Sequence, residues 1–179
     1  FSKDIHFSTG VEAFLWQIFI KQVEQHFNFS SVKYEDYGTD NTGKLVEKAT
    51  NNADYKISFE YDNKKYDILM EVKFSPIKGK CTFKVHDLQA YIKQNAYILL
   101  FYNVGKTDLR KPANYKLNKH LDLLSQELSN IRYAIISPEN IQKILVEHTH
   151  RKIHFMGGKL GLILSEKDYS KYFKERKIL

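Results

Sequence analysis

Cysteine is almost absent from this sequence. Cys81 is the only cysteine among 179 residues. The chain therefore cannot form an internal disulfide, and it cannot build a zinc site from several cysteines. A composition of this kind is typical of a reducing compartment, so we expect a cytoplasmic location.

Long hydrophobic runs are absent as well. The longest apolar stretches are "AFLWQIFI" and "AYILLFY", and both are far shorter than the roughly 20 residues that a membrane-spanning helix needs. No signal peptide is recognisable. We therefore expect no association with a membrane.

The chain also shows no internal repeat and no low-complexity linker. Its length suits one domain with a sizeable core. We expect residues 1–179 to form a single domain, in which residues 104–179 extend the core and serve specificity or dimerisation.

Acidic residues are fewer than basic ones. The sequence holds 28 Lys and Arg against 21 Asp and Glu, which gives a net charge of +7. An excess of positive charge points to an anionic partner, and nucleic acid is the commonest one. The alternative is a basic surface that is merely solvated.

Hydrophobic periodicity predicts a helix and a hairpin, followed by helices and strands in alternation. Thr9 and Glu12 fit a capping box, so the first helix is expected to begin near Thr9. This order predicts an α/β fold with a mixed central β-sheet flanked by helices. The predicted helices cover residues 9–27, 84–95, 120–130, 138–148 and 165–177, and the predicted strands cover 31–37, 55–61, 66–74, 96–103, 131–137, 153–158 and 160–165.

The hairpin predicted over residues 55–74 brings three charged residues together. A hairpin pairs residues whose numbers have a constant sum, and a turn centred on Asp62 and Asn63 places Asp54 opposite Glu71. Lys73 lies two residues beyond Glu71 and projects from the same face. Like charges placed opposite each other destabilise a strand pair unless a cation lies between them.

These residues have the chemistry of a divalent-metal site. Paired carboxylate oxygens suit Mg²⁺ or Mn²⁺, and such an ion lowers the pKa of a bound water. Lys73 could orient that water or offset developing negative charge. The parts fit phosphodiester hydrolysis. The alternative is an ordinary solvated β-ribbon, because a slip of one residue would separate the carboxylates.

The pattern of "AD" at 53–54 and "EVK" at 71–73 resembles the PD-(D/E)xK nuclease superfamily, which includes type II restriction endonucleases. Ala53 replaces the proline of the family's name. The resemblance implies a restriction-endonuclease-like αβββαβ core. It also implies that Asp54, Glu71 and the carbonyl of Val72 bind the metal, and that Lys73 is the catalytic lysine.

Two more positions are similar to those of the family. Many members carry an acid on the first helix, where Glu12 stands; its alternative role is that of the capping-box residue. Members of the Mrr-like branch carry a polar residue on the helix after the lysine strand, where Gln89 stands; its alternative role is that of a solvated helix residue. The segment "QAYIKQ" does not reproduce the Gln-x-x-x-Tyr helix of RecB-like nucleases.

Basic residues near these positions are candidates for contact with a phosphate backbone, although each could also belong to a solvated loop. His148, His150 and His154 form a further group. We expect this group to belong to a basic edge that contacts phosphate, and the alternative is a metal site. The basic candidates are Lys78, Lys80, Lys84, Lys106, Arg110 and Lys111.

The sequence therefore predicts a Mg²⁺-dependent endonuclease acting on DNA in restriction, defence or DNA processing. One site cuts one strand, so a homodimer or a larger nuclease complex is the expected assembly. Two rival hypotheses stand: a non-catalytic nucleic-acid-binding module on the same scaffold, and an enzyme that cleaves RNA.

Overall fold

The structure is a computed structural model that describes residues 2–26, 29–38, 51–110, 116–154 and 157–178. Its strands are β1 (Ser30–Asp36), β2 (Tyr55–Tyr61), β3 (Lys64–Ser75), β4 (Lys80–Lys84), β5 (Tyr97–Asn103), β6 (Ile131–Ile136), β7 (Arg151–Ile153), β8 (Lys159–Ser165) and β9 (Arg176–Lys177). Its helices are α1 (Ser2–His26), α2 (Val85–Lys93), α3 (Leu117–Gln126), the 3-10 turn η2 (Leu128–Asn130), α4 (Pro138–Glu147) and α5 (Glu166–Tyr172).

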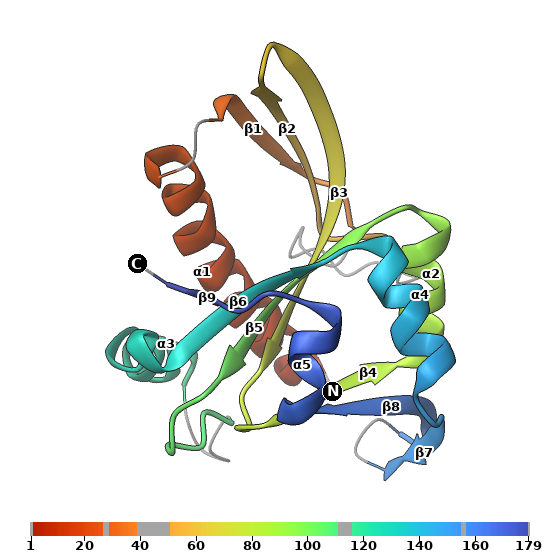
Figure 1. Ribbon diagram of the computed structural model, residues 1–179. Helices are drawn as coiled ribbons and strands as arrows, with labels where there is room; N and C mark the ends of the chain where they lie inside the picture. Colours follow the sequence, from red (N-terminus) through yellow and green to blue (C-terminus); the bar gives the residue numbers. More distant parts are fainter. Residues whose placement is uncertain (1, 27–28, 39–50, 111–115, 155–156, 179) are drawn as a thin grey trace.

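A mixed β-sheet forms the centre of the fold (Figure 1). Its strand order is β1-β2-β3-β5-β6-β9, with β3 and β5 parallel and the other neighbours antiparallel. A second sheet has the order β4-β8-β7. The α/β fold with a mixed sheet flanked by helices, predicted from the sequence, is confirmed.

Two hydrophobic cores lie on opposite faces of the central sheet. Alternate residues of β5 supply both of them, because successive side chains of a strand point to opposite faces. Leu99 and Phe101 pack in the core that α1 and α3 cover. Ile98 and Leu100 pack in the core that α2, α4, α5 and the second sheet cover.

Residues after 103 contribute to both cores. Ile131 and Tyr133 of β6 lie in the first, and Ala134 of β6 with Leu162 of β8 lies in the second. The C-terminal part of the chain is therefore built into the body of the fold. Within the described ranges, no helix is long and apolar enough to cross a membrane.

Helix α1 begins at Ser2 and not near Thr9, so the predicted start was wrong. The spacing of Thr9 and Glu12 that suggested a capping box falls inside the helix. At Gly10 a β-carbon would lie 2.7 Å from a methyl group of Leu117 on α3. A glycine in a helix interior costs about 1 kcal/mol relative to alanine, and here it permits the close approach of α3.

Strand β4 was not predicted, and the C-terminal helix was predicted too long. Cys81 and Phe83 of β4 alternate inward, but the strand is completed only by β8, about 80 residues further along the chain. Helix α5 ends at Tyr172, and Arg176 and Lys177 of the predicted helix instead pair with β6 as β9. Ser165 and Asp168 form the capping box of α5.

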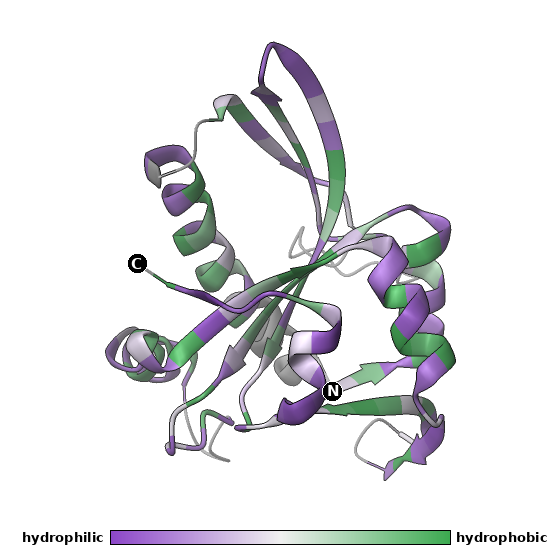
Figure 2. Ribbon diagram, viewed as in Figure 1, coloured by the Kyte–Doolittle hydropathy of each residue, from purple (hydrophilic) through white to green (hydrophobic). Residues whose placement is uncertain are grey.

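The hairpin of β2 and β3 extends away from the helices (Figure 1). Its outer end is hydrophilic, whereas the inner half of β3 is hydrophobic where it lies beside β5 (Figure 2). The inner half is therefore the part that is fixed by packing on both faces, and it is the part that carries Glu71 and Lys73.

Candidate metal and phosphate site

The register of the β2–β3 hairpin agrees with the register predicted from the sequence. Tyr55 pairs with Met70, and every pair from there to Tyr61 and Lys64 keeps the same offset. Asp62 and Asn63 have φ values of 50° and 57°, which fit a two-residue hairpin turn of type I′. The strand pairing ends at Tyr55 and Met70, and the same offset continued by one step brings Asp54 to the position opposite Glu71.

Two carboxylates take the place of strand β2 where it ends. From Glu71 onward β3 has no β2 partner, so the amide groups on that edge need other acceptors. Asp54 Oδ2 accepts a hydrogen bond of 2.8 Å from the Val72 amide. The Glu12 carboxyl group, on α1, accepts one from the Phe74 amide. Asp54 and Glu12 therefore lie side by side along the open edge of β3, at the amides of Val72 and Phe74.

Glu71 is a buried acid with two donors on one oxygen. Its residue is 4% exposed. The Tyr91 hydroxyl donates a 2.6 Å hydrogen bond to Glu71 Oε1, and the Lys73 ammonium forms an ion pair with the same oxygen. The Lys73 Nζ atom also lies 5.9 Å from the centre of the Tyr91 ring. Tyr91 and Lys73 therefore fix the position of Glu71.

The protonation states of this group differ from those of exposed side chains. Burial, aided by the negative charges of Asp54 and Glu71, raises the pKa of Glu12 to about 8, against the opposing charge of Lys73. Burial alone would lower the pKa of Lys73, but the carboxylate of Glu71 and other nearby groups raise it well above its usual value. At neutral pH Glu12 is largely protonated and Lys73 is an ammonium ion.

A cavity of about 330 Å³ opens beside these groups. It lies where α1, β3, β4 and α2 meet, so four elements that are distant in the sequence supply its wall. Its lining residues are Glu12, Lys73, Thr82, Phe83, Lys84, Asp87, Leu88 and Tyr91.

Gln94, just after α2, holds the segment that precedes Asp54. Its Oε1 atom accepts from the Ala53 amide at 3.1 Å, and its Nε2 atom donates to the Asn51 carbonyl at 2.6 Å. Ala53 itself is fully buried. The end of α2 therefore positions both acids, Glu71 through Tyr91 and Asp54 through Gln94.

Sequence reasoning did not single out Tyr91 or Gln94. The signal for Tyr91 was present, because Val85, Leu88 and Tyr91 form the buried stripe of α2. A buried tyrosine hydroxyl normally needs a hydrogen-bonding partner, and the adjacent strand offers the acid. Gln94 carries no comparable signal, because its partners are backbone atoms of a segment without regular structure.

Some of the predicted site residues line the cavity, and others do not. Glu12, Lys73 and Lys84 line the cavity. Gln89 is exposed and is not among the lining residues. Tyr91, two residues further along α2, lines the cavity instead, because residues two apart on a helix face different directions.

The other basic candidates lie outside the cavity wall. Lys78 and Lys106 are exposed, and Lys80 is half-buried on β4. Arg110 is exposed, but it forms an ion pair of 2.6 Å with Asp108, which offsets its charge. Lys111 lies outside the described residues.

The histidines near residue 150 do not gather around one point. His148 Nε2 lies 2.8 Å from the Tyr172 hydroxyl, and His150 Nε2 lies 2.8 Å from the Leu145 carbonyl. Within the described part of the chain, no group of three or more His, Cys, Asp and Glu is arranged to hold a metal ion.

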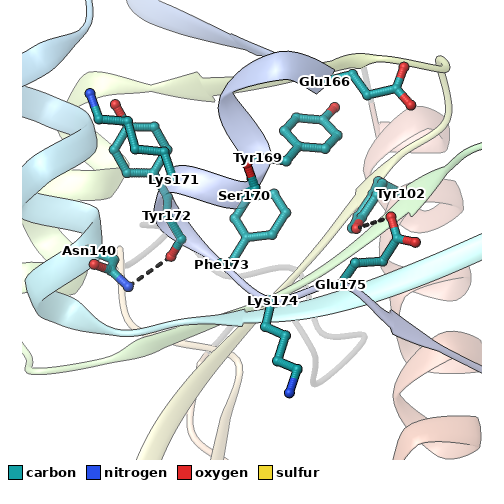
Figure 3. Close-up of a pocket in the computed structure, with 10 residues that line it drawn as sticks. All are labelled: Tyr102, Asn140, Glu166, Tyr169, Ser170, Lys171, Tyr172, Phe173, Lys174 and Glu175. Atoms are coloured by element: carbon teal, nitrogen blue, oxygen red, sulfur yellow. Dashed lines mark hydrogen bonds between the residues drawn. The ribbon is translucent and has the colours of Figure 1, made fainter.

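A larger cavity of about 580 Å³ lies along α5 and the segment that follows it (Figure 3). Two hydrogen bonds join residues of its wall: the Tyr102 hydroxyl donates to Glu175 at 3.0 Å, and the Asn140 amide donates to the Tyr172 carbonyl at 2.8 Å. The two cavities share no lining residue. Glu12 and Lys73 line only the smaller one, and neither Asp54 nor Glu71 is among the lining residues of either cavity.

No family model, no curated protein and no solved structure matches the chain. The resemblance to the PD-(D/E)xK superfamily therefore rests on the short motif at residues 53–54 and 71–73 and on the positions of Glu12 and Gln89. An assignment of function has to rest on the chemistry of the site.

Proposed function

We propose that the protein is a metal-dependent endonuclease that hydrolyses phosphodiester bonds in DNA. The observation that carries this proposal is the convergence of Asp54 and Glu12 on the open edge of β3, beside the Glu71–Lys73 pair. With Glu12 protonated at neutral pH, Asp54 and Glu71 carry two negative charges against the one positive charge of Lys73, and this excess would repel a phosphate unless a cation accompanied it.

The donors available to such a cation are oxygens. Asp54 and Glu71, with the carbonyl group of Val72, would hold Mg²⁺ or Mn²⁺, which prefer oxygen ligands. The bound ion would supply charge stabilisation and a water of lowered pKa. The arrangement of donors has the right chemistry, although Asp54 and Glu71 each have one oxygen engaged in the contacts described above.

The positive charge of Lys73 limits the part that this residue can take in the reaction. Because Glu71 holds the pKa of Lys73 well above its usual value, this side chain cannot remove a proton from water at neutral pH. It is instead a fixed positive charge at the wall of the cavity, able to orient a phosphate oxygen and to stabilise the negative charge of the transition state.

Tyr91 stays a hydrogen-bond donor in this arrangement. Burial raises the pKa of its hydroxyl far above the usual value, so the proton remains on the oxygen and the hydrogen bond to Glu71 persists. Tyr91 therefore orients a metal-binding acid and does not itself take part in proton transfer.

Cleavage of a supercoiled plasmid and of labelled oligonucleotides, with Mg²⁺, Mn²⁺ or EDTA, tests the proposal. Lys73→Ala should lower the single-turnover rate by on the order of 10² or more while DNA still binds. Lys93→Ala, exposed on α2, is the matched control and should leave the rate unchanged.

Two results would contradict the proposal. Purified wild-type protein that cuts no DNA with any divalent ion would leave the non-catalytic binding module as the better hypothesis. Metal-dependent cutting that Lys73→Ala leaves intact would show that the chemistry lies elsewhere. Preferential cleavage of RNA oligonucleotides would retain the mechanism and change the substrate.

A further inference from the structure

The second sheet presents a cationic surface next to the catalytic cavity. Its three strands read KCTFK, RKI and KLGLILS. They contain five Lys or Arg residues and no Asp or Glu, although the whole chain has 21 acidic residues against 28 basic ones. A charge balance so different from that of the chain marks this sheet as a candidate surface for an anion.

The alternation of the strands shows which side chains share a face. Cys81 and Phe83 of β4, with Leu162 and Leu164 of β8, point into the core. Residues between them point the other way. We call this side the outer face, and it comprises Lys80, Thr82 and Lys84 of β4, Lys159, Gly161, Ile163 and Ser165 of β8, and Arg151 and Ile153 of β7.

The register aligns two of these cations in one row. Lys84 pairs with Gly161, and Gly161 pairs with Arg151 on its other side. Two strand spacings separate Lys84 from Arg151, which is roughly 10 Å between their α-carbons. Between them Gly161 has no side chain, and the Ile153 side chain lies where a β-carbon of residue 161 would be, 2.5 Å away. No long polar side chain therefore stands between the two cations.

The row begins at the cavity. Thr82 and Lys84 of the outer face also line the cavity that holds Lys73 and Glu12. Lys84 lies 3.8 Å from Asp87, whose other carboxylate oxygen is 2.9 Å from His86. Arg151 and Lys159 are exposed, and no ion pair within the described residues involves either of them.

We propose that the outer face binds the phosphate backbone of a DNA strand where it leaves the catalytic cavity, with Arg151 and Lys159 as contacts beyond Lys84. This inference rests on the proposed nuclease function and adds the path of the substrate. A row of about 10 Å is long enough for Lys84 and Arg151 to contact different phosphates of one strand. Contacts of this kind fix the position of the strand and carry no sequence preference.

The test measures binding separately from cleavage. A fluorescein-labelled 20-nucleotide single strand and the matching duplex are titrated with protein in EDTA, at several salt concentrations between about 50 and 200 mM, and binding is followed by anisotropy. The test variant is Arg151→Ala/Lys159→Ala. The matched control is Lys119→Ala/Lys177→Ala, which removes the same charge from α3 and β9, where both side chains are exposed.

The expected result is specific to the two positions. The test variant should bind about tenfold more weakly or worse, and its slope of log affinity against log salt should become shallower by about 2, one for each lost phosphate contact. The control should keep the wild-type slope. An unchanged slope in the test variant overturns the proposal, and so does an equal loss in the control, because that would reflect net charge alone.

Failure of this inference can be told apart from failure of the nuclease function. Wild-type protein that cuts DNA with Mg²⁺, together with a test variant that binds normally, overturns only the path over the outer face. Wild-type protein that binds DNA through Arg151 and Lys159 but cuts with no divalent ion overturns only the catalytic assignment.

Discussion

Replacement of Glu12 by glutamine tests the electrostatics of the site without any substrate. The amide oxygen of glutamine can still accept the hydrogen bond from Phe74, so the local contact is kept and only the ionisable group is lost. In the wild type, burial is the main cause that raises the pKa of Glu12 from 4.5 to about 8.

The sign of the effect on stability follows from proton binding. Between pH 4.5 and 8 the folded protein keeps a proton on Glu12 that the unfolded chain has released. The free energy of unfolding therefore falls as the pH rises through this range, by at most about 1.4 kcal/mol per pH unit. Below pH 4.5 Glu12 is protonated in both states and does not lower the free energy of unfolding. Above pH 8 the free energy of unfolding stops falling, because the folded state also loses the proton.

The expected magnitude is smaller than this limit. From pH 5.5 to 7.5 the limit is about 2.7 kcal/mol, but Glu12 borders a cavity and is only partly buried by surface area. Water in the cavity screens the charge, so we expect a loss of about 1–2 kcal/mol in the wild type. Glu12→Gln should lack this part of the pH dependence and should be the more stable protein near pH 8.

Urea unfolding at several pH values, in EDTA, measures the difference. Other titrating groups affect both proteins alike, so the quantity of interest is the free energy of unfolding of Glu12→Gln minus that of the wild type. Glu24→Gln, exposed on the same helix, is the control and should track the wild type. Stability curves of wild type and Glu12→Gln that run parallel from pH 5.5 to 7.5 would refute the electrostatic account.

Three further predictions concern the same site. Tyr91→Phe removes the hydroxyl that donates to Glu71 and should lower the free energy of unfolding by about 1.5–3 kcal/mol; an unchanged urea midpoint would show that this hydrogen bond contributes nothing. Gln89→Ala should cleave at the wild-type rate, because its exposed side chain lies outside the cavity; a large loss of rate would restore the role that the resemblance implied. Mg²⁺ binding near pH 7 should release a proton from Glu12, because a cation disfavours the protonated acid; titration calorimetry in two buffers with different ionisation enthalpies would detect this, and identical heats would contradict it.

The hairpin was predictable because its determinants are local. Alternating residues 55–61, a turn at Asp62 and Asn63, and an apolar strand leading to Glu71 define one register within about 20 residues. The opposition of Asp54 and Glu71 follows from that register. Nothing distant in the sequence was needed to predict it.

The elements that were missed depend on distant partners. Strand β4 has only five residues and is completed by β8, so the sequence around it shows a loop leading into a helix. Glu12 was a candidate through the resemblance alone, because its spacing from Thr9 imitates a cap. Its place at the site arises because α1 packs along the edge of β3, and the local sequence does not predict that packing.

The two-residue turn of the hairpin also limits how the chain can change. Adding or deleting one residue on only one side of Asp62 and Asn63 would shift β2 against β3 and put a different residue opposite Glu71. Matched changes, with equal numbers of residues added to both strands beyond the body of the protein, would leave that opposition intact. The projecting arm is thus a part whose length can vary in evolution or by engineering, provided that both of its strands vary together.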